Sequence, residues 1–431
     1  MNYYSFLKSL TSSLKCFETS NSFKKIEDEK EKRKKGRDVD RLGLIPREVA
    51  KTVDIPHSTK EILSRLPVKS LLRFRCVCKA WCAVVKDPLF VDMHLNNYSR
   101  ANNLSLILES YDLCMLNNND GASYEVAKMD YRTKSDLSGL SILGSCNGLL
   151  CLGDTCSNMI SGICLDSNLC LWNPSTKRYR PLPVTPIQRR AYGSLLISCC
   201  SLYGFGYHAI TKDYKVVSIV CYDSEYSRQF SCDLEIKVYS FRYNSWRKAT
   251  RPLWMEFYYP RSDHEKRGSL VNGILHWLVI PSTKGRKYTV IPSTKGRKYS
   301  VIGFDVREEI FSDVPLPRDI DDDNELNNLK VTALDGYLCL ICGYKNHVEA
   351  WKMEDYCKKE SWIKLFTITG QREFRGFVPL CIRENKILLL DDNVLYLYDP
   401  EGHSVEKPEI KDIPERIRYA TSYTESLLPT D

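Results

Sequence analysis

Residues 61–90 read EILSRLPVKSLLRFRCVCKAWCAVVKDPLF, and this stretch decides how the chain is organised. Its apolar residues recur three or four positions apart, as on one face of a helix. Pro67 predicts a boundary between two helices, because proline interrupts a helix but is tolerated in a first turn. Asp87 and Pro88 predict the end of a third helix. We therefore expect three short helices, with Ser58 or Thr59 as the first N-cap.

Such a small helical domain is expected to leave part of its apolar surface open. Three helices in about 40 residues are near the lower limit for a stable core. Full burial of Trp81 would be worth at most ~4 to 6 kcal/mol. Periodicity leaves two interpretations open: Leu71, Val77 and Trp81 pack against the rest of this chain, or they contact a second protein.

The stretch ILSRLPVKSLLRFRCVCKAW at residues 62–81, with DPLF at 87–90, closely resembles the F-box. The resemblance implies docking to a Skp-type adaptor and, through it, to a cullin scaffold with a RING subunit. The family's adaptor-contacting positions correspond here to Ile55, Pro56, Leu63, Leu66, Pro67, Leu71, Leu72, Val77 and Trp81. Since Thr59 and Lys60 stand where the family usually has apolar residues, we expect a short, polar first helix. An earlier pair, Ile45 and Pro46, is a second candidate opening.

Upstream of this region the chain is polar and basic. The run KKIEDEKEKRKKGR at residues 24–37 predicts a disordered tether, and KRKK at 32–35 leaves a nuclear import patch open. Residues 1–17 could form an amphipathic targeting helix. No run of about 18 apolar residues predicts a membrane span.

The 18 cysteines are scattered through apolar surroundings. This pattern indicates buried, reduced thiols and a reducing compartment, the cytoplasm and/or the nucleus. Cys339 and Cys342 form a CxxC, but the flanking YLCLICGY predicts a strand, where residues three apart face opposite ways. We predict no metal site and no cofactor.

From about residue 104 short strands alternate with turn signals. One unit recurs: an apolar strand ending in an aromatic residue, a polar turn and a second strand. The aromatic residues are Trp172, Tyr239, Phe304, Trp351 and Tyr398. A partner strand follows a tight turn at Asn147-Gly148, Asn272-Gly273, Asp335-Gly336 and Asn385-Lys386, and begins at Asp213 in another unit. Each unit therefore predicts a four-stranded sheet.

Sheets repeating at this spacing suit propeller blades. Five units are clear, the stretch near Leu106 is a candidate sixth, and residues 418–428 are a candidate closing strand. GSCNGLLCL (144–152), LWNPSTKRYRPLP (171–183), YGFGYHAITKDYKVV (203–217) and SLVNGILHWL (269–278) also resemble the F-box-associated domain of plant F-box proteins. That domain is the substrate-recruiting half in such families.

The predicted fold class is therefore α+β and multidomain. A basic leader occupies residues 1–44, a three-helix F-box domain 45–97, and an all-β propeller-like, kelch-like domain 98–431. A β-sandwich is the alternative for the last domain.

Two segments are predicted to be loops. VIPSTKGRKYT at 279–289 is followed by the near-identical VIPSTKGRKYS at 290–300, and we expect one copy to be extruded from its blade. The duplication is either merely tolerated or provides a basic tip that binds a partner. The acidic run DIDDDNE at 319–325 predicts a solvated loop.

No residue pattern predicts catalysis. GSCNG at residues 144–148 imitates a nucleophile elbow around Cys146, but a strand follows it instead of a helix. His276, between Leu275 and Trp277, is expected to be structural. No phosphate-binding or dinucleotide-binding glycine motif is present.

The two resemblances together predict the substrate-recognition subunit of an SCF-type (Skp-cullin-F-box) ubiquitin ligase, which recruits a target protein for ubiquitination and proteasomal degradation. Such a subunit is a non-catalytic adaptor that acts by proximity. A receptor specialised for self-incompatibility or immune-receptor turnover, and a non-degradative Skp-binding adaptor, stay open. A propeller-fold enzyme is the alternative from another class. We expect no nucleic-acid partner, and the substrate is unknown.

Overall fold

The computed structural model describes residues 55–100, 104–118, 124–129, 141–153, 169–184, 198–223, 233–250, 257–258, 266–281, 299–317, 320, 326, 328–369 and 377–430. The chain divides into two units, Met1–Val53 and Asp54–Asp431. The predicted leader at 1–44 and the second candidate opening at Ile45 and Pro46 lie outside the described residues.

Within the described residues the helical region contains four helices, the three that were predicted and one that was not. They are α3 (His57–Leu63), α4 (Val68–Phe74), α5 (Lys79–Lys86) and α6 (Pro88–Arg100). Asp87 and Pro88 do end α5, but they also start α6. The Asp87 Oδ1 accepts a hydrogen bond of 3.1 Å from the Leu89 N–H, and Pro88 occupies a first helical position, where no N–H is needed.

The start of the first helix also differs from the prediction. Pro56 is the residue before α3 and no side chain caps the helix, so the N-cap assignment to Ser58 or Thr59 is wrong. Pro56 has an extended backbone (φ −53°, ψ 145°), which turns the chain into the helix without a capping side chain. Because α3 ends at Leu63, Leu66 lies in the turn before α4 and not on the helix.

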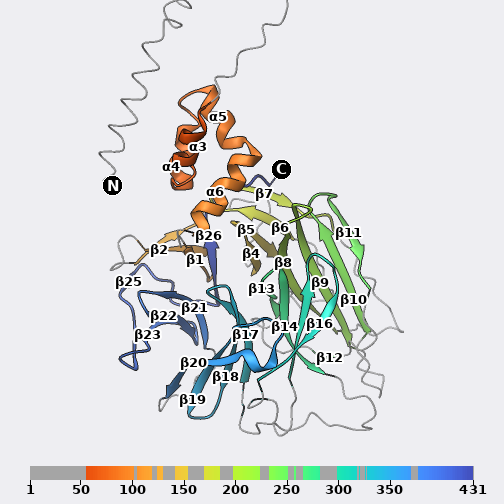
Figure 1. Cartoon of the computed structure of the whole chain (residues 1–431). Helices are drawn as coiled ribbons and strands as arrows, with labels where there is room; N and C mark the ends of the chain where they lie inside the picture. The colour runs from red at the N-terminus through yellow and green to blue at the C-terminus, as the bar shows by residue number, and fades with distance from the viewer. Residues whose placement is uncertain are drawn as a thin grey trace, which may run out of the picture. The chain divides into compact units, whose positions relative to one another are not determined.

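The rest of the described chain forms six β-sheets, which stand as blades around a ring and follow the chain's colour order in Figure 1. Blade 1 contains β1 (Leu104–Glu109), β2 (Leu113–Asn118), β3 (Tyr124–Lys128), β25 (Ile410–Lys411) and β26 (Tyr419–Thr424). Blade 2 contains β4 (Ser141–Cys146), β5 (Leu149–Gly153), β6 (Cys170–Asn173) and β7 (Arg178–Pro181). Blade 3 contains β8 (Ser198–His208), β9 (Asp213–Asp223), β10 (Asp233–Ser240) and β11 (Ser245–Lys248).

The second half of the ring is built in the same way. Blade 4 contains β12 (Phe257–Tyr258), β13 (Ser269–Val271), β14 (Ile274–Pro281), β15 (Ser300–Asp305) and β16 (Phe311–Val314). Blade 5 contains β17 (Asn328–Leu334), β18 (Tyr337–Gly343), β19 (His347–Met353), the short η2 (Lys359–Ser361) and β20 (Trp362–Thr369). Blade 6 contains β21 (Val378–Arg383), β22 (Lys386–Asp391), β23 (Val394–Asp399) and β24 (Ser404–Glu406).

The last strand closes the ring. β26 pairs antiparallel with β1 from Leu104↔Thr424 to Glu109↔Tyr419, so the first blade is completed by the end of the chain. The inner strands β26, β4, β8, β13, β17 and β21 contact one another in this order and return to β26. This closed order confirms the propeller, the sixth unit near Leu106 and the closing strand, and the β-sandwich alternative is wrong.

The predicted tight turns are present. Asn147-Gly148, Asn272-Gly273 and Asp335-Gly336 have positive φ at both residues, as a type I′ turn requires. The fourth turn has positive φ at Glu384 and Asn385, one position earlier than Asn385-Lys386. Gly148 is also tightly enclosed, because a Cβ built there would lie 2.4 Å from the Ser426 Oγ.

The core of the ring lies between neighbouring blades. Six apolar clusters fill the six junctions, each with residues of two adjacent sheets. The cluster between blades 3 and 4, for example, contains Ile236 and the fully buried Trp277, whose indole N–H donates to the Tyr203 carbonyl at 2.9 Å. Each blade therefore buries its faces only when both neighbours are in place.

A buried ion pair joins opposite sides of the ring. The Arg267 Nη2, just before β13, lies 3.0 Å from the Glu109 Oε2 at the end of β1. Glu109 also accepts hydrogen bonds from the N–H of Ile142 and the hydroxyl of Ser141, and the guanidinium lies over the Tyr419 ring. These contacts connect blades 1, 2 and 4 inside the ring.

The two faces of the ring carry different connections. The six inner strands run in the same direction, so the turn after each inner strand lies on one face, which we call the turn face. The turns between third and fourth strands, such as 174–177 and 241–244, lie on the same face. The end of β14 and the start of β15 lie at the opposite face. Residues 282–298 of the duplicated copies and most of the acidic run at 319–325 lie outside the described residues.

His276 is a structural residue, as predicted. It is fully buried on β14, its Nδ1 is 3.0 Å from the Ser269 carbonyl oxygen and its Nε2 is 2.8 Å from the Tyr356 hydroxyl. Burial lowers its pKa from 6.5 to about 4. The neutral imidazole therefore links blades 4 and 5.

Stability is expected to fall as the pH drops from about 6.5 to about 4. In this window the unfolded chain binds a proton at His276 that the folded chain does not, which removes at most ~3 kcal/mol of unfolding free energy. The thermal midpoint measured against pH should fall less steeply in His276→Gln than in the unchanged protein. The exposed His403→Gln should keep the original slope, and an equal slope in all three proteins would contradict the assignment.

Candidate functional site

The four helices enclose a small apolar core. It contains Leu63 of α3, Val68 and Leu71 of α4, Val84 and Val85 of α5, and Phe90 and Val91 of α6. Three of the predicted adaptor-contacting residues, Ile55, Leu63 and Leu71, are buried in this core. In the free chain these three side chains hold the helices together, so they stabilise the helical surface and are not part of it.

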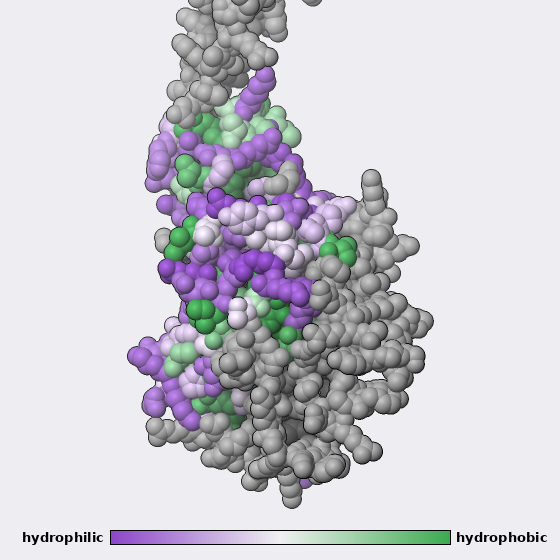
Figure 2. Space-filling view, turned by 90° about the vertical axis from the view of Figure 1, so that its right-hand side faces the viewer, coloured by the Kyte–Doolittle hydropathy of each residue, from purple (hydrophilic) through white to green (hydrophobic). Residues whose placement is uncertain are grey.

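The other six predicted residues reach the surface. Pro56, Pro67 and Val77 are exposed, Val77 to 57% of its surface, whereas Leu66, Leu72 and Trp81 are half-buried. Ile62, exposed to 49%, was not among the predicted positions. The apolar residues of the helical region are visible as green patches in Figure 2. This set of apolar residues outside the core, which we call the helical face, is the candidate functional site.

Aromatic packing fixes the half-buried part of the helical face. Trp81 of α5 packs edge to face against Phe74 of α4, with ring centroids 5.3 Å apart. Val77 lies in the turn between these two helices, since α4 ends at Phe74 and α5 begins at Lys79. The exposed Val77 side chain is therefore presented by a turn whose flanks are rigidly packed.

Helix α6 holds the corner between α3 and α4. The His94 Nε2 is 2.9 Å from the Leu66 carbonyl oxygen, and the Asn97 amide donates to the Ser64 hydroxyl at 2.8 Å. Burial lowers the pKa of His94, so the imidazole is neutral near pH 7 and donates to that carbonyl. The backbone of Leu66, just before the exposed Pro67, is thus fixed by a helix that sequence reasoning did not predict.

The end of the chain completes the helical core. Leu427, only 7% exposed, packs in the same cluster as Leu63 and Leu71. The Glu425 carboxylate accepts a hydrogen bond from the N–H of Val68 at the start of α4. Burial raises the pKa of this carboxyl, although Lys69 and the Val68 N–H oppose the shift.

The same segment is tied to the propeller. The Asn173 side chain at the end of β6 donates to the carbonyls of Ser426 and Leu428 at 3.1 and 2.8 Å. A second contact joins the helices to blade 3, where the Lys212 ammonium in the β8–β9 turn lies 2.7 Å from an oxygen of Asp92 in α6. Residues 425–430, which we call the C-terminal clasp, therefore link blade 2 to the helical core.

The clasp was missed by the sequence reasoning, which assigned residues 418–428 only to a closing strand. Leu427 and Leu428 have no helical or strand periodicity of their own, so no local signal assigns them to a core more than 330 residues upstream in the chain. The only local indication was the sequence Glu425-Ser426-Leu427-Leu428, directly after the last strand.

The side chains considered for chemistry are used in packing. Cys146 is buried between blades 2 and 3, and burial raises its pKa to about 12, which opposes a nucleophilic thiolate. Cys339 lies in β18 with its pKa also raised by burial to about 12. Within the described ranges no group of three or more His, Cys, Asp or Glu residues could hold a metal ion. No helix in those ranges is long and apolar enough to cross a membrane.

Removal of the Leu427 side chain should loosen the helices while the ring stays closed. Leu427→Ala is expected to cost about 2 to 4 kcal/mol in the stability of the helical core, because it opens a cavity there. Hydrogen exchange should speed up in α3–α5 and stay unchanged in β8–β11. The exposed Pro429→Ala is the matched control, and unchanged exchange in both variants would show that the clasp does not support the core.

Comparison with known proteins assigns both parts of the chain. A family model described as the F-box domain matches residues 55–92, and one described as the F-box associated beta propeller domain matches residues 107–427. The β-propeller domain of the trilobed protease from Pyrococcus furiosus has a TM-score of 0.33 at 9% identity, and the match covers 73% of this chain and 94% of that one.

Relatives of similar length are F-box proteins. The F-box protein CPR1 of Arabidopsis thaliana is 27% identical over 374 residues, covering 82% of this chain and 84% of that protein. The Arabidopsis F-box/kelch-repeat protein At3g23880 is 26% identical over 348 residues, covering 77% and 83%. Because the propeller-domain model alone matches residues 107–427, the chain belongs to the family of F-box proteins that carry an F-box associated beta propeller domain.

Proposed function

We propose that this protein is the substrate-recognition subunit of a Skp-cullin-F-box ubiquitin ligase. The helical face binds a Skp-type adaptor, the adaptor connects it to a cullin scaffold with a RING subunit, and the propeller holds a protein that is ubiquitinated and degraded. The F-box domain implies the adaptor, and the propeller is the part left for the substrate.

The observation that carries this proposal is the apolar surface that the F-box leaves uncovered. Val77 and Ile62 are about half exposed, and Pro56 and Pro67, which directly precede α3 and α4, are exposed as well. A partner that covers these side chains gains roughly 25 cal/mol per Å² of apolar area. The buried residues Leu63 and Leu71 keep the surface rigid, so little order has to be gained on binding.

The proposed mechanism is proximity and needs no chemistry by this chain. Because the clasp and the Lys212–Asp92 ion pair attach the F-box to blades 2 and 3, the adaptor and the propeller-bound protein keep a defined separation. A fixed separation raises the effective concentration of a substrate lysine near a charged ubiquitin carrier. The protein is proposed to work in this way in the cytoplasm and/or the nucleus, without a cofactor.

Two alternatives within the same class differ only in what happens after adaptor binding. A receptor specialised for self-incompatibility or immune-receptor turnover would use the same helical face, and so would an adaptor that binds Skp without promoting degradation. A propeller enzyme would need a cluster of carboxylates or histidines at the strand ends. Cys146 and His276 do not supply it, because both are buried in packed positions, where burial raises the pKa of Cys146 to about 12 and lowers that of His276 to about 4.

Adaptor capture tests the assignment of the helical face. Val77→Asp is expected to weaken binding to a purified Skp-type adaptor at least about tenfold, because a charge would be buried in an apolar contact, where it costs well over 1.4 kcal/mol. The double variant Leu66→Ala/Pro67→Ala should act in the same direction. Binding is measured by calorimetry with purified proteins.

Val405→Asp provides the matched control, since Val405 is also an exposed valine, at 42%, but lies on β24 of blade 6. It should bind the adaptor as the unchanged protein does. If Val77→Asp and Val405→Asp bind with equal affinity, the helical face is not the adaptor site and the proposed function loses its main support.

A further inference from the structure

The outer edges of the propeller blades differ in charge. In blade 2 the hairpin of β6 and β7, residues 170–181, contains Lys177, Arg178 and Arg180 and no acidic residue. In blade 3 the segment from 238 to 248 contains Arg242, Arg247 and Lys248 and again no acidic residue. We call these six side chains the basic edge.

The corresponding edges of other blades are acidic or mixed. In blade 6 residues 397–406 contain Asp399, Glu401 and Glu406 and no Lys or Arg. In blade 4 residues 304–314 contain four acidic side chains against a single arginine, Arg307. Charged side chains on outer strands discourage edge-to-edge pairing between molecules, which explains why the blade edges are charged. This general requirement does not explain why two adjacent edges both carry positive charge.

Contacts between blades 2 and 3 bring the two halves of the basic edge together. The Arg180 guanidinium lies over the Phe241 ring, 4.5 Å from its centroid, next to Arg242. The Trp246 indole N–H of β11 donates to the Pro183 carbonyl beyond β7 at 2.8 Å. Register places Arg178 and Arg180 on the same face of β7. The basic edge is therefore one continuous surface and not two separate hairpins.

The few carboxylates near the basic edge are already shared. Glu235 lies 3.2 Å from the Lys248 ammonium and 3.5 Å from that of Lys237, and Glu309 pairs with both Arg247 and Lys215. These two acidic groups thus face four basic ones, and a third, the buried Asp213, accepts hydrogen bonds from the Arg242 backbone N–H and the Ser240 hydroxyl. Lys177 and Arg242 lie in turns and are exposed, so the surface keeps a positive excess.

The basic edge lies beside the F-box. The turns 174–177 and 241–244 belong to the turn face, to which the C-terminal clasp and the Lys212–Asp92 ion pair attach the helices. The Asn173 that begins the first of these turns is the same residue that binds the clasp. A protein bound at the basic edge is therefore held on the side of the propeller that carries the F-box.

We propose that the basic edge binds an acidic segment of the protein that this chain recruits. This inference rests on the proposed function and names its substrate class: proteins with an exposed stretch rich in Asp and Glu. Guanidinium groups suit carboxylates because they donate two parallel hydrogen bonds. The surface already pairs with carboxylates of this chain, since the Lys248 ammonium lies beside Glu235 and the Arg247 guanidinium lies beside Glu309.

An acidic protein segment suits the surface better than the other partners of the same charge. The proposed function requires the propeller to hold a protein, and Asp and Glu side chains supply carboxylates that guanidinium groups bind. Tyr179 and Tyr243 are exposed beside the basic residues and offer faces for base stacking, so a single-stranded nucleic acid is the competing ligand in the test. The adaptor is assigned to the helical face, which contains none of the six basic residues.

Charge reversal tests the proposal on the full-length chain bound to its adaptor. The probe is a fluorescent peptide of twelve glutamates, and a peptide of twelve glutamines and an oligouridylate of the same length serve as comparison ligands. Lys177→Glu/Arg180→Glu/Arg242→Glu should weaken binding of the glutamate peptide at least about tenfold at 0.1 M salt and reduce its salt dependence.

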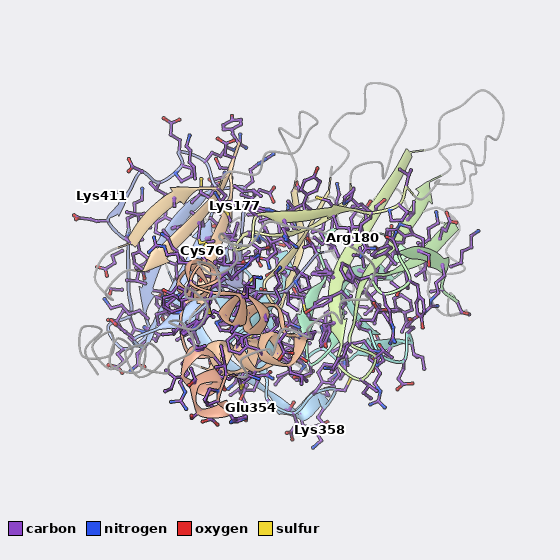
Figure 3. All side chains as sticks on the ribbon, turned by 90° about the horizontal axis from the view of Figure 1, so that it is seen from above. Cys76, Lys177, Arg180, Glu354, Lys358 and Lys411 are labelled. Carbon is purple, nitrogen blue, oxygen red and sulfur yellow. The ribbon has the colours of Figure 1, made fainter. Side chains whose placement is uncertain are left out.

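The matched control reverses three exposed lysines on other blades, Lys345→Glu/Lys358→Glu/Lys411→Glu, and should change binding less than about threefold. Figure 3 shows Lys411 at the left margin and Lys358 at the lower margin of the molecule, both away from Lys177 and Arg180. The two triple variants carry the same change in net charge. Equal weakening in both would show that only net charge matters and would overturn the proposal.

The adaptor provides a readout that separates this inference from the proposed function. Lys177→Glu/Arg180→Glu/Arg242→Glu should keep full affinity for the adaptor and lose affinity for the glutamate peptide. Val77→Asp should lose affinity for the adaptor and keep affinity for the glutamate peptide, which is measured for this variant in the absence of the adaptor. Equal peptide binding by the triple variant and the unchanged protein would overturn the proposal. Tighter binding of oligouridylate than of the glutamate peptide, or loss of adaptor affinity in the triple variant, would do the same.

Discussion

The pairing of β26 with β1 is the constraint on which the rest of this molecule depends. It supplies the inner strand of the first blade from the last part of the chain and so closes the ring. Each blade buries its faces only against two neighbours, and an open ring would leave two of the six apolar junctions incomplete. Ring closure is therefore a requirement of the fold and not a detail of one blade.

The same pairing also determines the F-box. Directly after β26 the chain places Glu425 at the start of α4 and Leu427 in the helical core, while Asn173 holds the backbone between them. The helices are too few to form a large core alone, and the missing apolar area is supplied by the end of the propeller. The F-box and the closed ring are thus energetically linked.

Two surfaces with different chemistry result from this architecture. The helical face is apolar and rests on a core that includes Leu63 and Leu71, so it suits a partner that buries apolar area. The basic edge is charged, lies on two adjacent blades, and suits a partner attracted by charge. Because the clasp ties blade 2 to the helices, partners on the two surfaces would be held in a defined relation, which proximity-based transfer requires.

The sequence by itself determined the architecture. The F-box spacing at residues 62–81 and the recurring hairpins with Asn-Gly and Asp-Gly turns are local patterns, and local patterns predicted the helices, the blades and the closing strand. The sequence-based prediction failed at two prolines. Pro88 both ends α5 and starts α6, and Pro56 stands before α3 where a capping side chain was expected. Only the tertiary structure decided which apolar residues are covered, that Leu427 joins a core far upstream, and that the charges of β7 and β11 form one surface. These depend on contacts between segments distant in sequence, for which neither periodicity nor composition carries a signal.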